Sequence, residues 1–261
     1  MNDFYADNNG NKINLKIEPE YSNYLFAQRI WLKVTLTNNS DLDYFIKENF
    51  DAVGIHFDIT TPNRTKLYNH VIVDSEIFDS IKLSPNQIYE NVFPIDNYIN
   101  SLNNVKGVYD IQAIFQNIIS NTISIDIERP EGDDRTQYLL FQNFITARDF
   151  QKSSENDFKD IEEFLKQYPY SVYAPDLYDQ LLIARLMSGK TNNVENTVIN
   201  FFNSYADSYE SKFIVNLYFS YLTKKGYSNA EAISKLKEIG NIYKNSKSDY
   251  TINNFIKKLK E

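Results

Sequence analysis

The spacing of apolar residues changes abruptly at the segment Arg129-Pro130-Glu131-Gly132-Asp133-Asp134. Before this segment, apolar and polar residues alternate in short runs, which is the period of a strand with one buried face. After it, apolar residues recur every three or four positions in longer runs, which is the period of an amphipathic helix. We therefore predict an α+β chain of two domains, residues 1–130 and residues 131–261, each long enough for its own core.

The first half is predicted to consist of short strands. Alternating runs centre on residues 13–17, 30–37, 53–59, 109–115 and 123–127, and two weaker runs lie at 77–83 and 87–93. The weaker pair is separated by Ser84-Pro85-Asn86, which is typical of a turn. About seven strands with turn signals between them indicate an immunoglobulin-like (Ig-like) antiparallel β-sandwich, although the Cys-Trp-Cys pattern of true immunoglobulin domains is absent.

The second half is predicted to be an all-α helical-repeat domain of about seven helices. The helical periodicity covers residues 135–151, 155–168, 172–187, 193–205, 211–225, 229–244 and 250–260. The stretch 211–225 is apolar almost all round, so we expect it to be the most buried helix. Pro169 should end one helix, and Ser171 should cap the next.

Four segments of the first half resemble a known pattern. They are Leu36-Thr37-Asn38-Asn39-Ser40, Leu83-Ser84-Pro85, Gly107-Val108-Tyr109-Asp110-Ile111 and Ser120-Asn121-Thr122-Ile123. In this order they are similar to bacterial Ig-like domains, found in exported proteins of Bacteroidetes and in intracellular proteinase-inhibitor-like modules. The resemblance implies an adhesion, scaffolding or inhibitor module without catalytic residues.

One junction in the second half resembles tetratricopeptide-like (TPR-like) repeats of bacterial envelope proteins. It runs Phe164-Leu165-Lys166-Gln167-Tyr168-Pro169-Tyr170-Ser171-Val172-Tyr173-Ala174. The 34-residue tetratricopeptide spacing and its Trp and Leu-Gly positions are missing. The resemblance implies that the helices bind a peptide or protein on a concave face.

Charge and hydropathy exclude some classes of partner. Residues 1–130 hold 17 acids and 10 bases, and residues 131–261 hold 18 and 17, so there is no basic footprint for a nucleic acid. No apolar run is long enough to span a bilayer. The first residues lack the features of a signal peptide, so we expect a periplasmic or cell-surface protein in its mature form, or alternatively a cytoplasmic one.

No catalytic or metal-binding pattern stands out. The chain has no cysteine and two histidines, His56 and His70, of which His56 shares a strand face with Asp58. Two histidines and one aspartate at loose spacing do not predict a metal site, and there is no Ser/His/Asp arrangement or glycine-rich phosphate loop. We predict no catalytic residue, no metal and no cofactor.

The leading prediction is a non-enzymatic interaction or surface-associated scaffold module that binds a protein or peptide. Tyr173 and Tyr178 are candidate anchors on the helices, because tyrosine buries a large area at low entropic cost. Trp31 lies on the polar side of its strand and is a candidate for an interdomain contact or a binding surface. The alternatives are a proteinase-inhibitor-like regulator acting through sandwich loops and a hydrolase with an unrecognised site. The sequence leaves the oligomeric state open.

Overall fold

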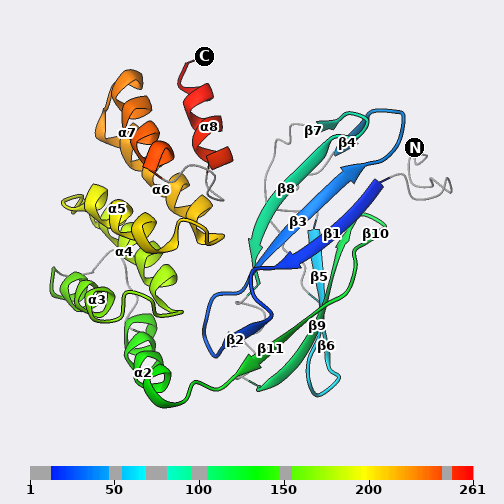
Figure 1. The fold of residues 1–261 in the computed structure, drawn as a ribbon, viewed down its shortest axis with the longest axis horizontal. Helices are drawn as coiled ribbons and strands as arrows, with labels where there is room; N and C mark the ends of the chain where they lie inside the picture. Colours follow the sequence, from blue (N-terminus) through cyan, green and yellow to red (C-terminus); the bar gives the residue numbers. More distant parts are fainter. Residues whose placement is uncertain are drawn as a thin grey trace. The chain divides into compact units, whose positions relative to one another are not determined.

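The computed structural model describes residues 13–46, 55–68, 81–95, 105–146, 155–242 and 249–260 (Figure 1). The chain is mixed α+β, as predicted, with antiparallel sheets and helices in separate parts of the sequence. Its contacts form two compact units. Unit 1 contains Met1–Phe26 and Ile30–Glu128, and unit 2 contains Ala27–Arg29 and Arg129–Glu261. The three residues Ala27–Arg29 therefore belong to the helical unit, although they lie between segments of unit 1 in the sequence. No pattern in the sequence predicted this.

The described part of unit 1 contains strands in three sheets. They are β1 (Ile13–Pro19), β2 (Asn23–Leu25), β3 (Trp31–Asn38), β4 (Tyr44–Ile46), β5 (Ile55–Thr60), β6 (Lys66–Tyr68), β7 (Ile81–Leu83), β8 (Ile88–Pro94), β9 (Gly107–Phe115), β10 (Ile118–Ile119) and β11 (Ile123–Glu128). One sheet has the order β1-β3-β8 and another β2-β11-β9-β5-β6 with β10 beside β9, while β4 pairs with β7. All pairings are antiparallel except that of β2 with β11.

Burial follows the predicted alternation. On β3 the side chains of Leu32, Val34 and Leu36 are fully buried, and on β9 Tyr109 and Ile111 are fully buried. The residues between them on β9 are only partly buried. Each of these strands therefore buries one face, and contacts of β1 with β9 and β11 join the two larger sheets in one core.

Two residues of the Ig-like sequence segments, Asn121 and Gly107, have a structural role in the sheets. The Asn121 side chain accepts a hydrogen bond from the Ile17 N–H (2.9 Å) and donates one to the Ile17 carbonyl (3.0 Å), as a neighbouring strand would. Gly107 has φ +133°, and a Cβ there would lie 3.0 Å from the ring carbons of Pro62. Glycine is therefore required at the start of β9.

Seven helices lie in the described part of unit 2. They are α2 (Gly132–Thr146), α3 (Glu155–Gln167), α4 (Ala174–Ser188), α5 (Val194–Tyr205), α6 (Glu210–Lys225), α7 (Asn229–Ile242) and α8 (Asp249–Lys258). Helix α4 packs against α3, α5 and α6. Its buried residues outnumber those of α6, so the expectation that 211–225 is the most buried helix is wrong. On α6 Phe213 is exposed, whereas α4 buries charged side chains that find partners.

One of the two predicted helix-end signals is confirmed. Helix α3 ends before Pro169, and α4 and α6 end at Gly189 and Gly226, both in the left-handed conformation that glycine adopts without strain. The predicted cap at Ser171 is wrong. Helix α4 begins at Ala174, and the Ser171 hydroxyl instead accepts from the Tyr173 N–H in the preceding turn (3.3 Å).

Several predicted ranges differ from the structure. The turn at Ser84-Pro85-Asn86 is confirmed, with a Gln87 N–H to Ser84 carbonyl bond of 3.0 Å. The strands β2, β4, β6 and β10 were not predicted, because two or three residues are too few to show alternation. Parts of four predicted elements, residues 53–54, 77–80, 147–151 and 243–244, lie outside the described residues.

Candidate functional site

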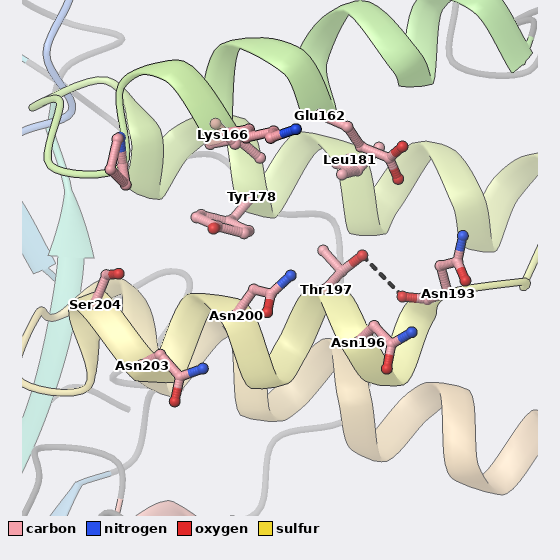
Figure 2. A pocket seen from close by; sticks show the side chains of 12 residues that line it. Glu162, Lys166, Tyr178, Leu181, Asn193, Asn196, Thr197, Asn200, Asn203 and Ser204 are labelled. Carbon is pink, nitrogen blue, oxygen red and sulfur yellow. Dashed lines mark hydrogen bonds between the residues drawn. The ribbon is translucent and has the colours of Figure 1, made fainter.

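A pocket of about 530 Å³ lies among α3, α4 and α5 of unit 2 (Figure 2). Helix α3 and the turn after it supply one wall, α4 the floor and α5 the other wall. The lining residues are Glu162, Leu165, Lys166, Pro169, Tyr178, Leu181, Asn193, Asn196, Thr197, Asn200, Asn203 and Ser204.

The α5 wall is a row of carboxamides. This helix buries Val198, Phe201 and Phe202 on one face. On its other face, polar residues recur every three or four positions. Those positions carry the asparagine row, which we define as Asn193, Asn196, Asn200 and Asn203. Within the described part of the chain, no hydrogen bond occupies the side chains of Asn196 and Asn200, and both residues are exposed.

The row starts at a turn that is held by local bonds. Asn193 has φ +67°, a conformation that asparagine tolerates better than most residues. The Thr197 hydroxyl donates to the Asn193 carbonyl (2.9 Å), which fixes the first turn of the helix (Figure 2). The threonine hydroxyl is therefore engaged locally, whereas the neighbouring Asn196 and Asn200 line the pocket without such a bond to any described residue.

Tyr178 forms part of the floor. Its ring packs edge-on against Phe201 (5.7 Å between centroids) and Tyr205 (6.2 Å), and the side chain is 7% exposed. Burial raises the pKa of the Tyr178 hydroxyl, so it stays a neutral donor at physiological pH. The Tyr205 hydroxyl donates to the Pro169 carbonyl (2.7 Å) and ties α5 to the turn that closes one end of the pocket.

The α3 wall carries one acidic and one basic side chain. Glu162 forms an ion pair with Arg185 of α4 (2.5 Å), and Arg185 also donates to the Asn192 carbonyl (2.6 Å). The guanidinium lies over the ring of Phe158, 4.9 Å from its centre, and its side chain is 3% exposed. No carboxylate in the described ranges lies within ion-pair distance of Lys166, which is exposed one turn after Glu162.

A second polar cluster in unit 2 surrounds Arg29. Its guanidinium forms ion pairs with Asp176, Asp179 (2.8 Å) and Glu210 (2.6 Å). These carboxylates come from α4 and from the first turn of α6, and their side chains are at most 9% exposed. One guanidinium therefore holds three carboxylates at the centre of the helical unit. The cluster stabilises the packing of α4 and α6.

The structure separates the three residues predicted to bind a partner. Tyr178 lines the pocket. Tyr173 does not, since it is 1% exposed and its ring stacks on Phe141, with 4.8 Å between centroids. Trp31 is the first residue of β3, opposite Pro94 of β8, and is 5% exposed. A role in partner binding stays a prediction for all three.

Sequence reasoning missed the asparagine row. Its signal was present as asparagines spaced by three or four residues from 193 to 203, but asparagine is abundant throughout the chain. The buried partner of Glu162 was also missed. Glu162 and Arg185 are 23 positions apart, and nothing in the sequence indicates that their two helices are neighbours.

The described residues contain no group of three or more potential metal ligands. His56 and Asp58 both lie on β5, opposite Ile114 and Gln112 of β9. His70 lies outside the described residues. Among the helices that the structure describes, none is both long and apolar enough to cross a bilayer.

No protein-family model and no curated protein matches this chain. A β-glucosidase from Listeria innocua in complex with isofagomine is 13% identical, with a TM-score of 0.30, over 44% of this chain and 16% of that one. An alkylpurine DNA glycosylase from Pseudomonas fluorescens, bound to DNA containing an abasic-site analogue, is 8% identical with a TM-score of 0.32, over 45% and 30%.

The CARDB domain of a Pyrococcus furiosus protein, in complex with di-metal ions, is 12% identical with a TM-score of 0.29, over 44% of this chain and 87% of that one. This chain thus spans under a third of the glucosidase and of the glycosylase. Similarities of this size support no argument about fold or function.

Proposed function

We propose that this protein is a non-enzymatic interaction module that binds an extended segment of a partner protein in the pocket among α3, α4 and α5. The observation that carries the proposal is the asparagine row on the pocket face of α5. Each carboxamide offers one acceptor and two donors, so it can bond both the N–H and the C=O of a peptide backbone.

The spacing of the row fits a peptide in the extended conformation. Asn196 and Asn200 are four residues apart, or about 6 Å along the helix axis. An extended chain repeats every two residues, at about 6.6 Å. The lining from Asn193 to Ser204 spans roughly 16 Å, enough for about five extended residues. The carboxamides of Asn196 and Asn200 can therefore meet alternate residues of one bound strand.

The chemistry of the lining favours binding over catalysis. Its one carboxylate, Glu162, is held by Arg185, so the pocket lacks the pair of carboxyl groups that acid-base catalysis uses. The one aromatic residue of the lining, Tyr178, is 7% exposed and offers no open ring face for stacking on a sugar. With catalysis and sugar stacking disfavoured, the lining is best suited to form hydrogen bonds with a peptide backbone.

For the fold, we propose that unit 1 is an Ig-like sandwich and unit 2 a TPR-like helical repeat. The Tyr109 hydroxyl donates to the Val105 carbonyl (2.7 Å) just before β9, which is similar to the tyrosine corner of Ig-like domains. The short turn between α3 and α4 at Pro169 supports a repeat of antiparallel helix pairs. On the resemblance of the strand motifs, we further propose a periplasmic or cell-surface location, tested by fractionating the native cells.

The binding proposal is tested with matched asparagine variants. Asn196→Ala with Asn200→Ala should abolish capture of a partner from native lysate by the immobilised full-length chain. The control is Asn216→Ala with Asn241→Ala, which removes two carboxamides from exposed positions on α6 and α7. This control should capture the same partner as the wild type.

Three results would contradict the proposal. Equal capture by both double variants would exclude the asparagine row. If truncation of the unit 1 loops abolished capture while the pocket variant retained it, the inhibitor-like alternative would be supported instead. Turnover in a broad hydrolase screen of the purified protein would exclude the non-enzymatic assignment.

A further inference from the structure

We infer that the pocket selects an extended peptide that carries an acidic side chain away from its ends, and that this side chain lies against Lys166. The inference rests on the proposed function and adds the chemical class of the bound segment. It follows from three features: which charges of the pocket are already compensated, where the remaining charge lies along the asparagine row, and which apolar side chains flank that charge.

The compensated charge is that of Glu162. Arg185 holds this carboxylate at 2.5 Å and is itself buried against Phe158, so the guanidinium cannot turn away to a ligand. The two groups form an ion pair of opposite charges, so the pair contributes no net charge to the pocket. The lining thus presents one uncompensated charge among the described residues, the ammonium of Lys166.

Lys166 lies between the ends of the asparagine row. In Figure 2 it stands across the pocket from the α5 wall, with Ser204 toward one side and Asn193 toward the other. A bound chain therefore continues past Lys166 in both directions. A side-chain carboxylate within the segment fits this position, whereas a free C-terminal carboxylate would leave carboxamides on one side without a partner.

The neighbouring side chains support a selective contact. Pro169 and Leu165 flank Lys166 along the α3 wall, and Leu165 is 6% exposed. An ion pair beside apolar groups is screened less by water than one on an open surface. A cationic peptide would place like charges together and would be rejected.

The test uses pooled peptides and the full-length ¹⁵N-labelled protein. Three pools contain heptapeptides that are capped at both ends and whose six flanking positions vary among Ala, Ser, Thr and Val. The central residue is Glu, Gln or Lys. A fourth pool has a central Gln and a free C-terminal carboxylate. Binding is followed by the chemical shifts of the Asn196 and Asn200 side-chain amides.

The Glu pool should bind tightest, by roughly fivefold over the Gln pool at low ionic strength, as expected for a partly exposed ion pair. The Lys pool should bind weakest. Lys166→Gln should remove the preference for Glu. Lys159→Gln, the same change of charge on an exposed position of α3 outside the pocket, should keep it.

Equal binding of the Glu and Gln pools overturns the inference but leaves the proposed function standing. The same holds if Lys166→Gln keeps the preference for Glu, or if the pool with the free C-terminus binds tightest. Absence of binding by all four pools overturns the inference and the proposed function together.

Discussion

At the scale of the residue, the buried side chain of Asn38 forms hydrogen bonds with backbone groups of Ser40 and Leu42, which lie outside the β-strands. Asn38 at the end of β3 is fully buried and donates to the carbonyls of Leu42 and Leu83 (2.8 Å each). Its oxygen accepts from the N–H (3.0 Å) and the hydroxyl (2.6 Å) of Ser40. One side chain thus closes the loop after β3 and joins it to β7.

Asn38→Ala should lower the free energy of unfolding of unit 1 by about 1–3 kcal/mol, because it removes the carboxamide donor from the buried Leu83 carbonyl. Urea unfolding followed by circular dichroism measures this change. The neighbouring Asn39 is exposed, and Asn39→Ala is the control. A loss as small as that of the control would show that water replaces the carboxamide.

At the scale of the element, ion pairs between helices set a pH dependence. Glu195 of α5 accepts hydrogen bonds from Lys235 of α7 (2.6 Å) and from the Tyr227 hydroxyl (2.9 Å). Burial opposes ionisation of this carboxyl, but the two donors outweigh it and hold its pKa below the usual 4.5. The folded state therefore binds the proton less tightly than the unfolded state.

It follows that the stabilisation from Glu195 is complete above about pH 4.5, the unfolded value, and is lost as the pH falls through the lower folded value. We expect Glu195→Gln to be less stable than the wild type above pH 5. The difference should narrow toward pH 3, because the wild-type carboxyl is then protonated. Chemical unfolding at a series of pH values measures this, with Glu163→Gln on the exposed side of α3 as control. A difference that is constant with pH would contradict the assignment.

The elements also show how far the sequence allows prediction. Apolar spacing of three or four located all seven helices of the described residues, because each helix from α2 to α8 has to bury a face. The same reasoning failed for the burial of α4, where Asp179 and Arg185 are 2% exposed. Hydropathy treats charged residues as exposed, and their partners Arg29 and Glu162 come from distant positions. The pocket could not be predicted for a related reason, since it depends on which helices are neighbours.

At the scale of the whole molecule, unit 2 depends on a residue from the beginning of the chain. Arg29→Ala should destabilise this unit by about 3–5 kcal/mol, because it removes the guanidinium with which three buried carboxylates form ion pairs. Hydrogen exchange of the amides in α4 and α6 reports this loss directly. Arg135→Ala, at an exposed position of α2, should leave the exchange rates unchanged. If both variants exchanged alike, the carboxylates would have another source of compensation.

The membership of Ala27–Arg29 in unit 2 also constrains how this chain can change over generations. A recombination event that copied only the gene segment after β11 would transfer Asp176, Asp179 and Glu210 without their guanidinium. The new host protein would then inherit helices whose three buried acids lack the ion pairs to Arg29. Descendants of this protein should therefore retain the strands and the helices together, or replace these acids when the two separate.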